Sequence, residues 1–154
     1  MSSPSFVVRP AEAADLASWR QLRRALWPDA TDSAHDHEIA EILADAERYE
    51  TFIVFSDTHT PVGFAEASIR HDYVNGCETS PVLFLEGIYV TPAVRRRGVA
   101  KALFECVERW GASHGCEEFA SDTAIDNVGI QALHVALGFE ETERVVYFRK
   151  PIRK

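Results

Sequence analysis

The stretch that decides the fold runs from residue 82 to residue 100 and reads Val82-Leu83-Phe84-Leu85-Glu86-Gly87-Ile88-Tyr89-Val90-Thr91-Pro92-Ala93-Val94-Arg95-Arg96-Arg97-Gly98-Val99-Ala100. Its first nine residues are almost continuously apolar, which predicts a central strand that is buried on both faces and ends at Pro92. After the arginines, apolar residues recur at helical spacing at Ala100, Leu103, Phe104, Val107 and Trp110. The stretch therefore predicts a buried strand, a basic turn and an amphipathic helix.

The basic turn has the features of an anion site. A junction from a strand to a helix directs free backbone N–H groups and the positive end of the helix at a ligand. Gly98 lets a phosphate approach the backbone closely, and Arg95, Arg96 and Arg97 add positive charge. A solvated basic turn is the alternative, but the position after a buried strand favours a diphosphate ligand.

Further elements follow on both sides of this stretch. Periodicity and turn residues predict strands at 6–8, 51–55, 62–69, 118–121 and 145–148, and helices that contain 16–26, 32–46 and 126–137. Asp15 begins the first helix, Asp32 or Ser33 caps the second, and Asp126 or Asn127 caps the last. The expected order is βααβββαβαβ, an α/β fold.

Composition and charge limit the classes of function. The chain has 154 residues, enough for one domain, and its formal net charge of -8 disfavours binding to nucleic acid or anionic lipid and favours cationic partners. Three cysteines without C-x-x-C spacing, and His35 and His37 two residues apart, indicate no metal site. No run approaches the length of a membrane span. We expect one cytoplasmic domain, 1–154, without a metal.

The basic turn resembles the acetyl-CoA loop of the GNAT superfamily of N-acetyltransferases. The pattern R/Q-x-x-G-x-G/A is matched by Arg95, Gly98 and Ala100, and Asn127 with the later Leu137-Gly138-Phe139 is similar to the closing motif of the superfamily. The order of the expected elements is also that of the superfamily, so the resemblance extends over nearly the whole chain. It implies a mostly antiparallel sheet that is flanked by helices and splays at its centre.

This resemblance implies that acetyl-CoA is the co-substrate. Its pantetheine arm would enter the splayed sheet and bond to the strand backbone at Ile88, Tyr89 and Val90. The residues that would hold the rest of the cofactor are Arg95, Arg96, Arg97, Gly98, Val99, Ala100 and Asn127.

The chain departs from the superfamily at the position of the general acid. Many GNAT enzymes carry a tyrosine, four positions before the glycine of the Gly-Phe pair, that protonates the leaving thiolate, and His134 stands there in this chain. A histidine can donate a proton at neutral pH, which makes His134 a candidate acid. A histidine that is only packed or hydrogen-bonded on the last helix explains the residue equally well.

Longer stretches resemble one subgroup, the type I aminoglycoside 6'-N-acetyltransferases. They are Leu26–Asp29, Ala67–Gly76 with Thr79–Pro81, Phe84–Ile88, Ala120–Asp122 and Gly138–Val145. The resemblance implies that the aminosugar is bound by Trp27, Tyr73, Glu86, Asp122 and Glu143. A polycation rich in hydroxyls needs carboxylates for its ammonium groups and aromatic faces for its rings, so the residue types agree with this substrate.

Each of these five residues also has a purely structural explanation. Glu86 interrupts an apolar strand, where a carboxylate is costly without a partner, and this favours a function. Asp122 fits a turn at the end of a strand, and Glu143 fits a solvated acidic edge. Trp27 and Tyr73 fit core or rim aromatics, although placement in a loop favours Tyr73 as a contact.

The implied reaction is direct transfer of acetyl from the thioester to a primary amine. Glu86 or Asp122 would take the proton of the amine, directly or through water, and a backbone N–H near Tyr89 or Val90 would polarise the carbonyl. Two alternatives remain: acetylation of a polyamine, small metabolite or peptide amine, and a silent acetyl-CoA sensor. The subgroup also implies a homodimer with the last strand at the interface.

Overall fold

A computed structural model describes residues 5–153 of the chain. The chain divides into two compact units, 1–122 and 123–154, which are described separately. The first unit contains, in order, β1 (Phe6–Pro10), η1 (Ala13–Asp15), α1 (Leu16–Leu26), α2 (Asp32–Ala44), β2 (Tyr49–Ser56), β3 (Pro61–Arg70), β4 (Val82–Val90), η2 (Pro92–Val94), α3 (Val99–Ser113) and β5 (Phe119–Ser121). The second unit contains α4 (Val128–Ala136).

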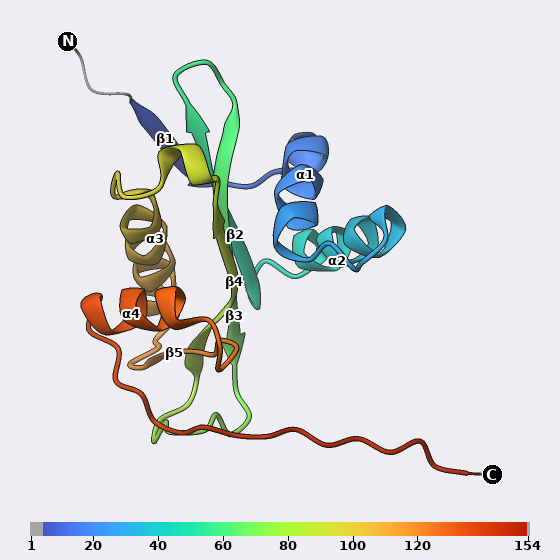
Figure 1. Ribbon diagram of the computed structural model, residues 1–154, viewed down its shortest axis with the longest axis vertical. Helices are drawn as coiled ribbons and strands as arrows, with labels where there is room; N and C mark the ends of the chain where they lie inside the picture. Colours follow the sequence, from blue (N-terminus) through green and yellow to red (C-terminus); the bar gives the residue numbers. More distant parts are fainter. Residues whose placement is uncertain (1–4, 154) are drawn as a thin grey trace. The chain divides into compact units, whose positions relative to one another are not determined.

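The strands of the first unit form one mixed sheet in the order β1-β2-β3-β4-β5 (Figure 1). The first three pairings are antiparallel, and β5 alone lies parallel to its neighbour, β4. The expected α/β fold with a mostly antiparallel sheet is therefore confirmed.

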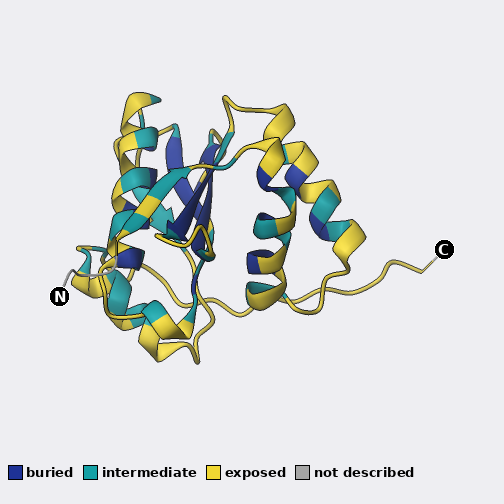
Figure 2. Cartoon of the chain, turned by 90° about the horizontal axis from the view of Figure 1, so that it is seen from above, coloured by how far each residue is buried: buried dark blue, intermediate teal, exposed yellow. Residues whose placement is uncertain are grey.

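Helices cover both faces of this sheet. α1 and α2 lie on one face and α3 lies on the other (Figure 1). Buried residues are concentrated in the strands and on the sides of α1 and α3 that face the sheet (Figure 2). Trp19, Leu22 and Ile39 fill the core on the α1 side, whereas Leu103 and Val107 are buried on α3. The amphipathic spacing in the sequence thus identifies the inner faces of α1 and α3.

The helices α1 and α2 begin differently. Asp15 stands at the N-cap of α1 but makes no side-chain capping hydrogen bond to it; its carboxylate pairs with the Arg9 guanidinium at 2.7 Å, which lowers its pKa, and accepts from the Glu12 N–H at 2.8 Å. α2 is capped by Thr31, whose Oγ1 accepts from the Ala34 N–H at 3.1 Å. The prediction of a cap at Asp32 or Ser33 is wrong by one residue.

The prediction of a strand buried on both faces holds for only part of β4. Residues 82–85 and Val90 are buried, whereas Glu86 is exposed and 87–89 are half-buried. The strand that is buried along nearly its whole length is β3, from Val62 to Ile69. It lies between β2 and β4, so both of its edges are paired as well.

The second unit differs from the expectation at its end. α4 begins as predicted after Asn127, whose Oδ1 accepts from the Ile130 N–H at 3.3 Å. No strand forms at 145–148, and the described residues from 139 to 153 have no regular structure, so the observed order is βααβββαβα. β-branched and aromatic residues favour a strand only where a second strand completes the hydrogen bonds, and 123–153 contain no other strand.

No helix among residues 5–153 is both long and apolar enough to cross a membrane.

Candidate active site

Glu86 occupies a β-bulge in the middle of β4. Across the β3–β4 pair, Glu66 lies opposite Gly87 and Ala67 lies opposite Leu85, which leaves Glu86 as the extra residue. A bulge disrupts the ladder locally and re-aims the side chain of the inserted residue. The carboxylate that interrupts the apolar run is therefore not buried: its side chain is 35% exposed.

Two polar side chains of β3 hold the Glu86 carboxylate. The Ser68 hydroxyl donates to Oε1 at 2.5 Å, and Nη2 of Arg70 donates to both oxygens at 2.9 and 3.1 Å. The Arg70 guanidinium in turn lies 3.5 Å from the centroid of the Phe84 ring. The carboxylate is thus fixed in place and remains open to solvent, so a proton donor or an ammonium group can reach it.

β4 and β5 pair over three residues only, which are the whole of β5. The parallel register joins Leu83 to Phe119 and ends where Leu85 meets Ser121. Glu86 and Asp122 are the next residues on the two strands, so both carboxylates stand where the pairing stops. Among residues 5–153, no strand continues the ladder along β4 from Glu86 to Val90 on the β5 side. The pairing thus ends where the splay of the sheet is predicted, and the splay itself stays a prediction.

Trp27, directly after α1, packs against β4 beside the bulge. A Cβ added to Gly87 would lie 2.5 Å from Cζ2 of Trp27, so the indole covers the backbone next to Glu86. Its ring centroid lies 6.0 Å from that of Phe64, in an edge-to-face contact. Trp27 is half-buried. The residue is therefore a wall of the Glu86 site as well as a part of the core.

Tyr73 lies in the loop between β3 and β4 and is 80% exposed. The loop is attached to the residue before β5: the Glu118 carboxylate accepts the backbone N–H groups of Glu78 and Thr79 at 2.9 and 2.7 Å. These hydrogen bonds, with that from the Thr79 hydroxyl, lower the pKa of Glu118. Because the loop is held at its base while Tyr73 projects into solvent, placement favours a ligand contact over packing.

The predicted phosphate loop connects β4 to α3. Arg95 donates from Nε to the Val90 carbonyl oxygen at 2.9 Å and so closes the turn, while Arg96 and Arg97 are exposed. Gly98 is left-handed, with φ of 80°, immediately before Val99 begins α3. The first N–H groups of a helix have no partner within the helix. The loop therefore presents both the charges and the backbone donors that a diphosphate needs.

The remaining predicted residues belong to the second unit. Nδ1 of His134 donates to the Ile130 carbonyl oxygen at 2.8 Å, and the ring meets Phe139 edge-to-face at 5.0 Å. These contacts match the explanation of His134 as a packed, hydrogen-bonded residue, and its role as an acid stays a prediction. Asn127 is the cap of α4, and Glu143 lies in the segment without regular structure.

A buried charged pair was missed from the sequence. Glu66 on β3 is only 4% exposed, and its carboxylate accepts from the indole N–H of Trp19 at 2.7 Å and from Nη1 of Arg23. Burial raises the pKa of Glu66, and the charge and hydrogen bonds of Arg23 oppose this shift. One signal was available: Arg23 takes a position on the inner face of α1, beside Leu22, in an otherwise apolar stripe.

Other chemistries find no support in the described residues. No group of three or more His, Cys, Asp or Glu side chains among residues 5–153 is arranged to hold a metal ion. Cys77, Cys106 and Cys116 are free thiols, and burial raises the pKa of Cys77 and of Cys116. A raised pKa reduces the thiolate fraction at neutral pH, so neither of these two cysteines has the properties of an activated nucleophile.

Comparison with known proteins agrees with this geometry. The model of the acetyltransferase (GNAT) family matches residues 17–139. An aminoglycoside N(6')-acetyltransferase type 1 of Salmonella enteritidis is 53% identical over 93% of this chain and 97% of its own length. One of Stenotrophomonas maltophilia is 52% identical over 99% of this chain and 97% of its own length.

A solved structure has the same fold. AAC(6')-Iy in complex with the bisubstrate analogue CoA-S-monomethyl-acetylneamine is 51% identical and superposes with a TM-score of 0.91 over 96% of this chain and 99% of its own. The family model covers most of the chain, and strands β2 to β5, the loop before α3 and the exposed Glu86 lie within it. The chain belongs to the acetyltransferase (GNAT) family.

Proposed function

We propose that this chain is an aminoglycoside 6'-N-acetyltransferase, which transfers acetyl from acetyl-CoA to the 6'-amine of an aminoglycoside. One observation carries the proposal: the exposed, anchored Glu86 carboxylate stands at a bulge beside Trp27, where the pairing of β4 with β5 ends. Relatives at about half identity over nearly the whole chain are named for this activity, which agrees with the cationic substrate that the site chemistry favours.

The acetyl-CoA site uses the edge of β4 and the start of α3. The pantetheine arm pairs with the β4 backbone at Ile88, Tyr89 and Val90, which no strand of the described chain covers on the β5 side. The pyrophosphate lies on the loop before α3, where Gly98 leaves its Cβ position open and Arg96 and Arg97 face solvent. The residues assigned to this loop are Arg95, Arg96, Arg97, Gly98, Val99 and Ala100, and Asn127 is assigned to the cofactor from the second unit.

The aminosugar site uses the residues around the bulge. Glu86 and Asp122 bind ammonium groups, and Trp27 and Tyr73 offer aromatic faces to the sugar rings. Glu143 adds a third carboxylate from the second unit. A net charge of -8 assists the capture of such a polycation through long-range attraction.

The reaction is a direct transfer without an acyl-enzyme. Glu86 or Asp122, directly or through water, takes one proton from the ammonium group, and the neutral nitrogen attacks the thioester carbonyl. A backbone N–H near Tyr89 or Val90 stabilises the tetrahedral intermediate. The C–S bond then breaks, the nitrogen loses its second proton to water to give the amide, and the thiolate takes a proton, with His134 as the candidate donor. The raised pKa values of Cys77 and Cys116 agree with a mechanism that needs no protein thiolate.

We also propose that residues 1–154 act as one domain and assemble into a homodimer in the cytoplasm. The family model crosses the boundary between the two units, which supports a single domain. The apolar side chains at 145–148 are exposed, and a second copy of the chain would supply the strand partner that they lack within 123–153. Three free thiols fit a reducing compartment. The negative charge disfavours binding to nucleic acid or a membrane surface.

The test is release of the free thiol of coenzyme A when the purified protein is mixed with acetyl-CoA and kanamycin or tobramycin, with spermidine as a comparison. We expect turnover with the aminoglycosides and its loss when analogues with a 6'-hydroxyl replace the 6'-amine. Activity on spermidine alone would assign the enzyme to metabolic amines. Binding of acetyl-CoA without turnover of any amine would favour a sensor.

A further inference from the structure

Arg23 is a buried cation that the proposed reaction does not use. Its side chain is 2% exposed on the inner face of α1. Nη1 donates to both carboxylate oxygens of Glu66, Nη2 donates to Glu38, and Nε donates to Nδ1 of His35 at 3.1 Å. A guanidinium with its donors directed at three partners has little freedom to rotate.

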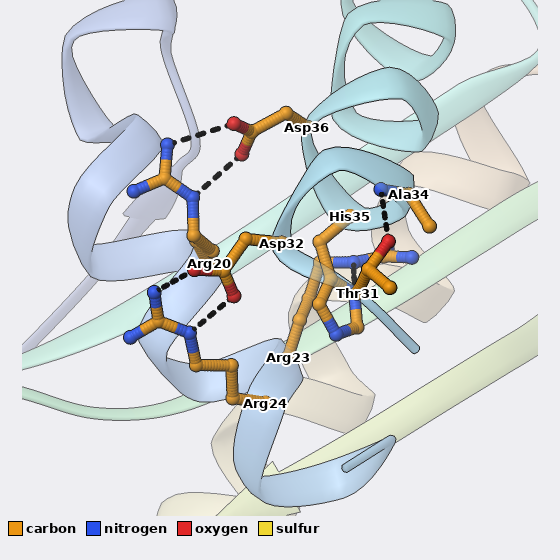
Figure 3. A network of polar contacts seen from close by, with 8 residues as sticks. All are labelled: Arg20, Arg23, Arg24, Thr31, Asp32, Ala34, His35 and Asp36. Atoms are coloured by element: carbon orange, nitrogen blue, oxygen red, sulfur yellow. Dashed lines mark hydrogen bonds and ion pairs between the residues drawn. The ribbon is translucent and has the colours of Figure 1, made fainter. Parts of the chain in front are cut away.

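His35 fixes the second side of this guanidinium. The residue lies on α2 with 0% exposure, and its Nδ1 accepts the Arg23 hydrogen bond and therefore carries no proton. Figure 3 shows Arg23 reaching from α1 to His35, beside two ion pairs that also join α1 to α2, Arg20 with Asp36 and Arg24 with Asp32. Arg23 is thus held from both β3 and α2.

Arg23 also contacts Trp27, the aromatic residue of the candidate substrate site. Cζ of Arg23 lies 4.7 Å from the centroid of the Trp27 ring, a cation–π distance. On its other contacts, the Trp27 indole meets Phe64 and covers Gly87, the residue next to Glu86. Glu66, the partner of Arg23, lies opposite Gly87 across the bulge. One buried cation therefore touches both the tryptophan and the strand pair that carries the bulge.

We propose that Arg23 is a positioning residue for the aminosugar: held by Glu66 and His35, it fixes the Trp27 indole against Gly87, beside the Glu86 carboxylate. The inference rests on the proposed function, because it takes Trp27 as a wall of the aminosugar site. Because the indole is already ordered before the ligand binds, no binding free energy is lost in ordering it.

The first test compares Arg23→Lys with Arg24→Lys. Lysine keeps the charge opposite Glu66 but loses the planar face and the donors to His35. We expect Arg23→Lys to raise KM for the aminoglycoside roughly three- to tenfold, the range of a partly desolvated cation–π contact, with kcat and KM for acetyl-CoA unchanged. Arg24→Lys is the matched control, because Arg24 bridges α1 to Asp32 on α2 and its side chain is exposed.

A double-mutant cycle then separates positioning from general damage to the fold. If Arg23 acts through Trp27, Arg23→Lys changes KM for the aminoglycoside in the wild-type background and has no further effect in a Trp27→Leu background. Multiplicative effects of the two substitutions would overturn the proposal. If Arg23→Lys does not fold, the pair Arg23→Met with Glu66→Gln removes both buried charges together and takes its place in the cycle.

A second measurement does not depend on acetylation of any substrate. In ¹H–¹⁵N spectra of the ligand-free protein, the indole N–H signal of Trp27, assigned with Trp27→Phe, should shift or broaden in Arg23→Lys and stay in place in Arg24→Lys. An unchanged Trp27 signal in Arg23→Lys would overturn the positioning role whatever the substrate. A wild-type protein that does not acetylate aminoglycosides would instead overturn the proposed function. The comparison of the Trp27 signals would still show whether Arg23 positions the indole.

Discussion

Gly87→Ala tests the contact between the bulge and Trp27 through a single added methyl group. The new Cβ would lie 2.5 and 2.6 Å from Cζ2 and Cη2 of the indole and 3.0 Å from Cδ2 of Leu26, whereas ordinary contacts are 3.4 to 4 Å. The indole would have to retreat by about 1 Å to restore van der Waals contact. Phe64 and Arg23 lie against the same ring and oppose this movement.

Overpacking of this kind costs about 1–3 kcal/mol of unfolding free energy. For a chain of this size, that corresponds to a fall in Tm of roughly 2–10 °C. Because the displaced ring borders Glu86, we also expect a several-fold rise in KM for the aminoglycoside, with KM for acetyl-CoA unchanged. Differential scanning calorimetry and initial-rate kinetics on the same preparation measure the two effects.

The control removes the group that collides. In a Trp27→Leu background the two indole carbons are absent, so Gly87→Ala should lower Tm by much less than it does in the wild type. A Gly87→Ala protein with wild-type Tm and wild-type KM would refute the packing of Trp27 on the bulge. An equal fall in Tm in both backgrounds would show that the damage arises elsewhere.

Three further substitutions test the site and the fold. Glu86→Gln should lower kcat for the aminoglycoside about 10²- to 10⁴-fold, the usual range for loss of a general base, with KM for acetyl-CoA unchanged in initial-rate assays. Gly98→Ala has open space for its Cβ but must adopt a φ of 80°, so it should cost about 1–2 kcal/mol of stability in urea titrations and raise KM for acetyl-CoA. Arg9 lowers the pKa of Asp15, so the pair stabilises the fold at pH values above the pKa of Asp15 in the unfolded chain, and this stabilisation is lost as the pH falls through the pKa of Asp15 in the folded chain. Asp15→Asn should therefore lower the free energy of unfolding by about 1–2 kcal/mol at pH 7. Urea titrations should show this difference shrinking below about pH 4.

Much of the fold follows from local patterns in the sequence. The apolar spacing on α1 and α3 predicts their inner faces, and the turn residues around Gly98 predict the junction that begins α3. The final strand was predicted wrongly, because apolar β-branched residues at 145–148 indicate a preference, whereas a strand needs a paired neighbour that residues 123–153 do not supply. Pairing is a property of the assembled sheet and is not encoded within one segment.

The candidate site could be predicted in part. Glu86 stands out because a carboxylate interrupts an apolar run, and the family loop identifies the cofactor segment. The pattern does not reveal how the carboxylate avoids burial, since a bulge depends on the register between two strands. The position of Arg23 in the apolar stripe of α1 is a signal, but the pattern does not identify Glu66 as its partner, and only their approach across α1 and β3 allows both charges to be buried.

The bulge also explains why simple alternation along β4 misleads. Residues four apart on a regular strand share a face. The Leu83 side chain nevertheless packs against Gly111 of α3, whereas Gly87 lies under Trp27 on the α1 side. The single extra residue between them, Glu86, reverses the faces for the rest of the strand. The same insertion that exposes the carboxylate thus turns Gly87 towards the tryptophan, so one irregularity places both the candidate base and the aromatic wall of the aminosugar site. A regular strand of the same composition would have Gly87 on the α3 side and could not provide this arrangement.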